Sequence, residues 1–174
     1  MKIYPIDVLL FFGGMFLFGG LFYLGGCGHE EGPETEAVVH LNCPDQWPVK
    51  RKTKITSGFG IRRHPISKKK GLHTGIDFRV PVGTPVLATA SGIVQKAETN
   101  QKESSYGLHL ILGHDSVYST LYAHLSQLKV KTGAHVKAGD TIALSGNTGY
   151  SKGAHLHYEI IQEGIQIDPK PYLK

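Results

Sequence analysis

Residues 149–161 have the sequence GYSKGAHLHYEII, in which a glycine-bounded turn precedes an alternating apolar run. Side chains alternate between the two faces of a β-strand, so His155 and His157 share one face while Leu156 and Tyr158 share the other. Two imidazoles fixed on a rigid strand suit a metal site, because metal ligands must be held to a fraction of an ångström. A His-x-His pair is a weak signal by itself, and the rest of the chain decides its meaning.

From Trp47 onward the chain has the pattern of an antiparallel β protein. Short β-branched and apolar runs are separated by turn sequences such as residues 132–133 and 146–149. The expected strands are Ile55–Ile61, Val86–Ala90, Ile93–Ala97, Leu108–Leu112, Tyr118–His124, Thr141–Leu144 and Tyr158–Ile161. No amphipathic helix stands out, so the pattern predicts a mainly β domain with its site in a groove between sheets. Residues 62–71 are rich in lysine and lack periodicity, which predicts a loop beside the groove that either contacts substrate or is a plain solvated loop.

A second group of polar residues lies upstream of the His-x-His pair. His73 and Asp77 are four residues apart, and Gly75 between them favours an extended or turning backbone. The alternating run 118–125 contains a further histidine, His124. Two histidines and one carboxylate form a suitable inner sphere for a catalytic zinc ion and leave the fourth position for water. Five such groups together also leave two imidazoles for proton transfer or charge stabilisation.

Several ordered motifs in the chain resemble those of the zinc metallopeptidases of the lysostaphin/LytM type, peptidase family M23. The resemblance covers residues 47–173, and the matching motifs are Ile55–Arg62, His73-x-x-x-Asp77, Tyr122–Leu125, Ala143–Gly149, Gly153-x-His155-Leu156-His157 and Asp168-Pro169. It implies an antiparallel β-sandwich or β-roll peptidase domain that binds one zinc ion. The family's metal ligands fall on His73, Asp77 and His157, and its catalytic histidines fall on His124 and His155.

The resemblance also implies an activity, namely hydrolysis of peptide bonds in bacterial peptidoglycan by metal-activated water. All five functional positions of the family are present in this sequence. The alternatives are a non-hydrolytic module that recruits or activates another wall hydrolase, a purely structural zinc site, and a part of a larger machine that opens the wall locally. Structural zinc sites usually have four protein ligands, and no fourth ligand is evident in the sequence.

The first 27 residues are not expected to belong to the domain. They contain an uncharged apolar run, Val8–Leu24, followed by Gly25-Gly26-Cys27. The sequence LGGC at 24–27 resembles a bacterial lipobox, which predicts a lipoprotein whose signal peptide is removed and whose Cys27 is lipidated. The alternative is an uncleaved anchor, because the run is slightly short against the ~20 residues that span a bilayer but long for a signal-peptide core of ~7–15. Both predictions place the domain outside the cytoplasm, attached to the membrane of the cell envelope.

The two alternatives predict different chemical states for the two cysteines. Acylation of Cys27 would leave Cys43 unpaired, whereas an uncleaved anchor would permit a Cys27–Cys43 disulfide in an oxidising compartment. Neither cysteine lies in a Cys-x-x-Cys pair, so neither is assigned to the metal.

Charge is unevenly distributed along the chain, whose formal net charge is +5. Residues 28–45 are acidic and aperiodic, which predicts a flexible tether, with a specific partner-binding arm as the alternative. Residues 46–174 form the expected domain and hold the positive charge. A basic domain favours an anionic envelope polymer or lipid surface as its partner, and the alternative is a solvated basic face without such a partner. Its basic residues lack aromatic interleaving and any recognised binding motif, so no nucleic-acid partner is expected.

Other polar and aromatic residues have weaker predictions. Among the remaining histidines, His64 and His114 are the best candidates for indirect support of the site. Tyr122 and Tyr158 lie in expected strands and are predicted to be packing residues. Gly149 is expected to shape a turn.

Overall fold

Antiparallel strands make up nearly all of the regular structure. The structure is a computed structural model, and it describes residues 42–50, 53–63, 70–99 and 105–174. The strands are β1 (Ile55–Ser57), β2 (Gly60–Arg63), β3 (Lys70–His73), β4 (Ile76–Phe78), β5 (Pro85–Leu87), β6 (Gly92–Glu98), β7 (Leu108–Gly113), β8 (Tyr118–Leu128), β9 (His135–Val136), β10 (Thr141–Ser145), β11 (Leu156–Gln162) and β12 (Ile165–Ile167). Within those ranges, the short 3-10 helix η1 (Lys170–Tyr172) is the one helical element. The prediction of a mainly antiparallel β domain is confirmed.

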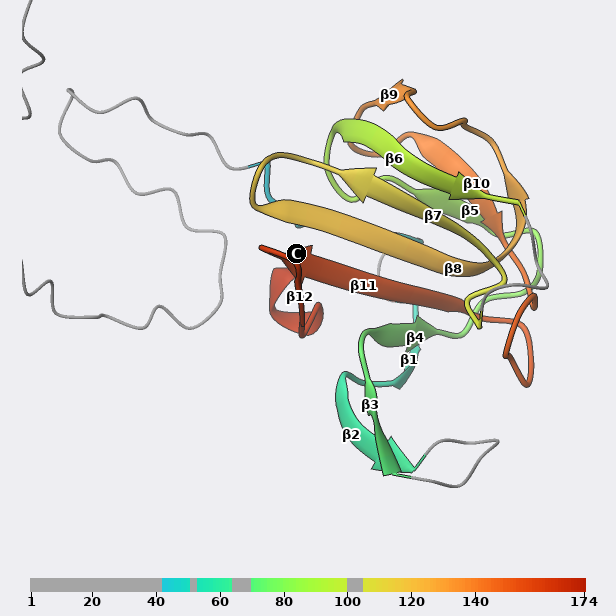
Figure 1. Cartoon of the computed structure of the whole chain (residues 1–174). Coiled ribbons are helices and arrows are strands. Elements are labelled where there is room, and N and C mark those ends of the chain that lie inside the picture. The colour runs from blue at the N-terminus through green and yellow to red at the C-terminus, as the bar shows by residue number, and fades with distance from the viewer. Residues whose placement is uncertain (1–41, 51–52, 64–69, 100–104) are drawn as a thin grey trace, which may run out of the picture.

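A single large sheet forms the body of the domain (Figure 1). Its strand order is β1-β4-β11-β8-β7-β6-β9, β10 joins it by pairing with β8, β5 pairs with β10, and β12 pairs with β11. The long strand β8 is central, because it pairs with β11 and β7 and also with β10. This arrangement places β4 and β11, which carry the upstream and downstream polar motifs, side by side.

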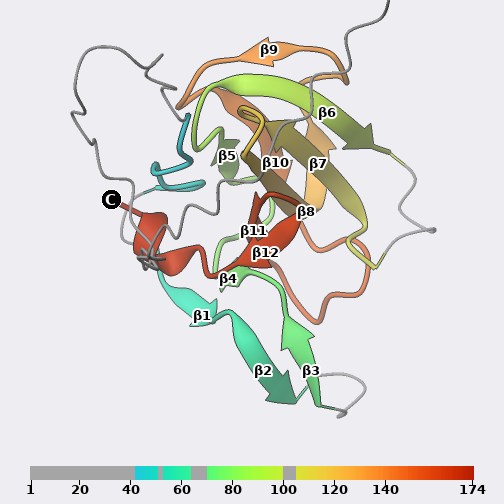
Figure 2. The ribbon, with the colours of Figure 1, turned by 60° about the vertical axis from the view of Figure 1, so that its left-hand side comes forward.

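The β2–β3 hairpin is separate from this sheet and projects away from it in both views (Figures 1 and 2). The prediction of one strand over 55–61 is therefore wrong, because β1 pairs with β4 whereas β2 pairs with β3. The backbone changes direction at Gly60, whose φ of 117° disfavours other residues. The predicted loop 62–71 is also wrong at both ends, since 62–63 and 70–71 are paired strand residues. Its central part, 64–69, lies outside the described residues.

The core lies under one face of β11. Leu156, Tyr158 and Ile160 alternate into it and are fully buried, as strand periodicity requires. The rings of Tyr122 and Tyr158 pack with centroids 5.3 Å apart, and the Thr89 hydroxyl lies 3.0 and 3.1 Å from their two hydroxyl oxygens. The prediction that both tyrosines are packing residues is confirmed.

The chain enters the domain along its outer surface. The Asn42 amide nitrogen donates to Asp115 Oδ2 over 2.8 Å, Cys43 packs against the core, and Pro44 is buried. Residues 1–41, which include the predicted signal peptide or anchor, Cys27 and most of the predicted tether, lie outside the described residues. Among the residues that are described, no helix has the length and apolar character needed to cross a membrane.

Candidate metal centre and cleft

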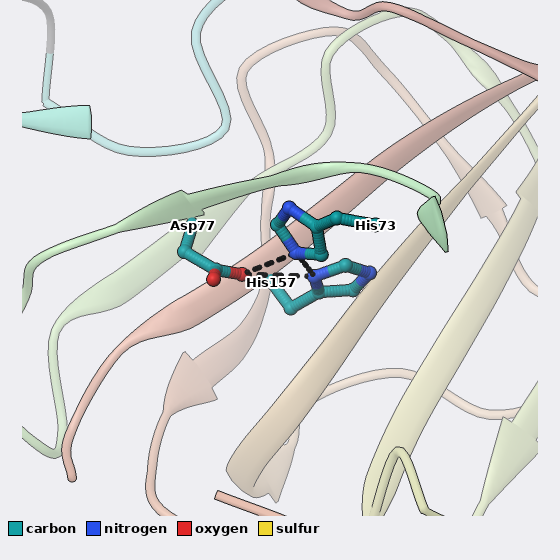
Figure 3. Close-up of side chains that lie close together, drawn as sticks. All are labelled: His73, Asp77 and His157. Atoms are coloured by element: carbon teal, nitrogen blue, oxygen red, sulfur yellow. Dashed lines mark hydrogen bonds and ion pairs between the residues drawn. The ribbon is translucent and has the colours of Figure 1, made fainter. Parts of the chain in front are cut away.

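Strand pairing brings the two polar motifs together. In the β4–β11 ladder, Asp77 lies directly opposite His157, so their side chains emerge from neighbouring positions on one face of the sheet. The core-facing residues of β11 flank His157, which is why this imidazole points the other way. Figure 3 shows Asp77 and His157 side by side with His73 next to them.

His73 reaches the same point from the other sheet. It is the last residue of β3, paired with Gly60, and the chain then crosses to β4 through Thr74 and Gly75. A Cβ atom at Gly75 would lie only 2.2 Å from the Tyr158 carbonyl oxygen, so only glycine permits this close approach to β11. The His73–Asp77 spacing therefore works because of a backbone crossing between two sheets, in agreement with the turning backbone expected from the sequence.

Three possible ligand atoms converge. Asp77 Oδ1 is 3.2 Å from His73 Nε2 and 2.9 Å from His157 Nδ1, and those two nitrogens are 3.1 Å apart. Ligand atoms at ~2.0–2.1 Å from a tetrahedral zinc ion lie roughly 3.3 Å from one another, which is close to these separations.

The outer contacts of the two imidazoles support a cation at this point. His73 Nδ1 donates to the Gly58 carbonyl oxygen over 2.7 Å, and His157 Nε2 donates to Glu159 Oε1 over 2.9 Å. In the neutral rings, the inner nitrogens therefore direct lone pairs at each other and at a carboxylate oxygen. Such a cluster of acceptors is stable only around a proton or a metal ion, so these residues fit a divalent metal.

The pKa shifts of Asp77 and His157 also support a cation at this point. Burial works against a charge on Asp77, but the imidazoles of His157 and His73, which can donate to it when they are protonated, hold its pKa well below the usual range. Burial likewise opposes charge on His157, yet hydrogen bonds to Asp77 and Glu159 raise its pKa. Both pKa shifts indicate that a positive charge is favoured between the carboxylates of Asp77 and Glu159.

Glu159 contacts the candidate site and was missed by sequence reasoning. It is fully buried, and its Oε1 accepts hydrogen bonds from His157 Nε2, from Tyr106 Oη over 2.8 Å and from the Thr74 hydroxyl. Burial favours the neutral acid, but the bonds from His157 and Thr74 prevail and lower its pKa. Period-two alternation puts Glu159 on the same face of β11 as His157, and this signal could have identified it.

His124 occupies a strained backbone position. Its φ is 58°, a left-handed conformation that is uncommon outside glycine and clusters at functional sites. The ring is anchored because Nδ1 donates to the Thr148 carbonyl oxygen over 2.8 Å, which leaves Nε2 as an acceptor. Burial lowers the His124 pKa to about 4, so the imidazole is neutral near neutral pH.

His155 lies against His124, with ring centroids 4.6 Å apart. Its Nδ1 donates to the Gly153 carbonyl oxygen over 2.7 Å, and its Nε2 is 3.8 Å from Asp77 Oδ1. The two histidines are thus held in the same way, each by a backbone carbonyl at Nδ1 with Nε2 available for chemistry. The structure brings all five sequence-predicted site residues together.

These side chains line an open cleft of about 520 Å³. The β2–β3 hairpin contributes Arg62 and Leu72 to its wall, and the loop before β11 contributes Tyr150 and Lys152. The predicted position of the site, in a groove between sheets, is confirmed. Tyr106 also lines the cleft and was not predicted, because no local pattern distinguishes it from a packing aromatic residue.

Of the two predicted supporting histidines, the structure describes His114, which does not contribute to the cleft. His114 bonds to the Ser91 carbonyl and the Thr120 hydroxyl and does not line the cleft. Burial lowers its pKa. His64 lies outside the described residues.

Comparison with known proteins identifies relatives over the same part of the chain. Peptidoglycan DD-endopeptidase ShyA of Vibrio cholerae is 42% identical over 124 residues, which are 71% of this chain and 28% of that protein. A crystal structure of a zinc-containing peptidase from Vibrio cholerae superposes with a TM-score of 0.65 at 39% identity, covering 74% of this chain and 38% of the other. The catalytic domain of lysostaphin from Staphylococcus simulans superposes with a TM-score of 0.62 at 36% identity, covering 69% and 91% of the two chains.

The matches cover different shares of this chain and of its relatives. This chain spans about a quarter to a third of the length of the curated relatives that it matches. The family model of peptidase family M23 matches residues 71–169, which include all five polar side chains of the cleft. Since that match covers more than half of the sequence, the chain belongs to peptidase family M23.

Proposed function

We propose that this chain is a zinc-dependent endopeptidase that hydrolyses peptide bonds of bacterial peptidoglycan. The observation that carries the proposal is the convergence of His73, Asp77 and His157, whose ligand atoms all lie within 4.8 Å of one another in a cleft. His124 and His155 adjoin them with Nε2 atoms available. Relatives named as peptidoglycan DD-endopeptidases and a structural neighbour described as zinc-containing support the substrate and the metal.

The chain's own residues account for most of the required chemistry. Zinc, when bound, would supply a Lewis acid that acidifies water and polarises a peptide carbonyl. Neutral His124 can accept a proton at Nε2 from the attacking water. His155, whose Nδ1 is fixed by a carbonyl oxygen, can hold a proton at Nε2 for the leaving amine or for the developing oxyanion.

Digestion of purified sacculi by the full chain tests this proposal. We expect soluble muropeptides, whose masses identify the scissile bond, and we expect their release to stop on chelation and to resume with added zinc. Stoichiometric zinc without muropeptide release would contradict the proposal and indicate a non-hydrolytic module that acts through another hydrolase.

Two groups of variants test the division of roles. His124→Ala and His155→Ala should slow turnover by ~100- to 1,000-fold while retaining zinc, because each removes a proton-transfer or oxyanion group. His73→Ala, Asp77→Ala and His157→Ala should lose the metal itself. Zinc content measured by atomic emission distinguishes the groups, and equal zinc loss in both would refute the assignment.

We also propose that the domain acts in the cell envelope and is attached to the membrane by an uncleaved N-terminal anchor. The apolar run Val8–Leu24 supports this attachment, and so does Cys43, which is disulfide-bonded as expected for an uncleaved anchor. Mass spectrometry of the protein from the membrane fraction should find an unprocessed N-terminus. A processed N-terminus with a lipid on Cys27 would instead indicate a lipoprotein.

A further inference from the structure

The described walls of the cleft hold more positive than negative charge. Arg62 and Lys152 line it, whereas Asp77 is the one carboxylate among the described lining residues. Glu159 lies beneath the surface and is fully buried. Because a divalent ion overcompensates the charge of Asp77, the metal-loaded cleft is cationic and attracts anionic groups.

Arg62 lies close to the reacting centre. Its Nη2 is 3.5 Å from Asp77 Oδ2, while the other oxygen of that carboxylate faces His73 and His157. The guanidinium and the two imidazoles therefore contact the two different oxygens of the same carboxylate. The Arg62 side chain is partly buried and lines the cleft, whereas its neighbour Ile61, on the opposite face of β2, is exposed and does not.

The guanidinium has capacity for a second acidic partner. Within the described part of the chain, Asp77 is the one acidic group in contact with Arg62, and the contact involves one nitrogen at a long distance. An arginine side chain has five N–H donors in a fixed fork that matches a carboxylate in bidentate geometry. A ligand carboxylate in the cleft can therefore pair with Arg62 without displacing Asp77.

Peptide chemistry identifies which substrate carboxylate could reach this position. The residue on the acyl side has its carboxyl group in the scissile bond. The residue that supplies the scissile nitrogen can still carry a free carboxylate on the adjacent carbon, and its carboxyl carbon lies roughly 3–4 Å from the scissile carbonyl oxygen. With that carbonyl at the metal centre, the free carboxylate lies within reach of Arg62.

We infer that Arg62 is a specificity-determining residue that binds a free carboxylate on the amine side of the scissile bond. The enzyme would then favour cross-links that carry this carboxylate over amidated or neutral ones. This inference rests on the proposed function and deepens it. The competing role is purely positional, in which Arg62 orients Asp77 and the charge of the substrate is irrelevant.

Two synthetic branched peptides distinguish these roles, one with a carboxylate next to the scissile nitrogen and one with a carboxamide there. For the full-length wild type, kcat/KM should be about 10- to 100-fold higher for the carboxylate peptide, as expected for charge-assisted hydrogen bonds. Arg62→Gln should lose this preference by slowing only the carboxylate peptide. Lys70→Gln removes the same charge from the exposed face of the hairpin, outside the cleft lining, and should keep the preference.

Zinc content measured on all three proteins completes the test, and we expect one ion per chain in each. The inference is overturned if the wild type cleaves both peptides equally, if Arg62→Gln slows both equally, or if Arg62→Gln loses zinc. Failure of the proposed function is distinguishable, because a wild type without activity on either peptide or on sacculi would refute hydrolysis itself.

Discussion

At the residue scale, His157 is held by a carboxylate contact on each of its two ring nitrogens. It lies between Asp77 and Glu159, with each ring nitrogen 2.9 Å from a carboxylate oxygen. Metal-ligating histidines commonly donate their second nitrogen to a carboxylate, which fixes the tautomer and increases ligand basicity. Glu159 has this relation to His157, so its effect on the metal can be tested separately from the ligands.

Glu159→Ala should weaken zinc binding by about 10- to 100-fold, the usual cost of losing such a partner. Glu159→Gln should lose less affinity, because an amide oxygen can still accept from His157, Tyr106 and Thr74 after the charge is removed. Competition with a chromophoric chelator measures both affinities. An alanine variant that binds zinc as tightly as the wild type would show that Glu159 does not support the ligand.

The raised pKa of His157 predicts a pH dependence of metal binding. A proton on Nδ1 competes with zinc, so the apparent affinity should increase about tenfold per pH unit below that pKa and level off above it. Titrations at several pH values measure the slope, and an affinity that does not change with pH would contradict this account.

Stability should change with pH in the opposite direction when the metal is removed. In the metal-free protein, the raised His157 pKa contributes stability that is fully present below the unfolded value of 6.5 and is lost as the pH rises through the folded value. Calorimetry should therefore show that chelation lowers Tm more at alkaline pH than near pH 6.5.

At the scale of elements, the site depends on how closely the turn between β3 and β4 approaches β11. The proposed ligands His73 and Asp77 flank Gly75, whose missing side chain permits the contact with the Tyr158 carbonyl. Any added atom must push the turn away from β11, which carries the third proposed ligand. Packing and metal geometry are thus coupled at one glycine.

Gly75→Ala should lower the free energy of unfolding by about 1–3 kcal/mol, as overpacking does, and should also weaken zinc binding. Gly58→Ala is the matched control, because a Cβ there has no atom within 4 Å. Urea denaturation and a zinc titration on both variants measure the two effects. Loss of stability with unchanged zinc affinity would show that the turn and the metal site are independent.

At the scale of the whole molecule, residues 42–45 tie the entry of the chain to distant parts of the domain. Asn42 bonds through its side chain to the Ser91 carbonyl oxygen over 2.5 Å, and the Lys174 amide nitrogen donates to the Asp45 carbonyl oxygen over 3.0 Å. These contacts join the beginning and the end of the described domain, so they should contribute to its stability.

A fragment of residues 42–174 should therefore be more stable than a fragment of residues 46–174. The difference should be roughly 2–3 kcal/mol, because about three hydrogen bonds and the buried Pro44 are lost. Urea denaturation gives the difference, and Asn42→Ala in the longer fragment isolates the contribution of its side chain. Equal midpoints would show that residues 42–45 are dispensable.

Local sequence patterns determined the strand periodicity, which correctly separated the core-facing Leu156 and Tyr158 from His157. Ordered motifs also identified the five polar residues that the fold brings together. Both kinds of information are carried by neighbouring residues or by a family resemblance, so neither needs knowledge of strand pairing.

Only the tertiary structure decided how these residues meet. The division of 55–61 between two sheets, the left-handed backbone of His124 and the approach of Arg62 to Asp77 all depend on strands that pair across long sequence separations. The ring nitrogens of His73 and His157 meet across 84 positions in the sequence. Alternation specifies which face a side chain occupies, whereas ladder register and sheet packing specify what it faces, and these arise only when the whole chain folds.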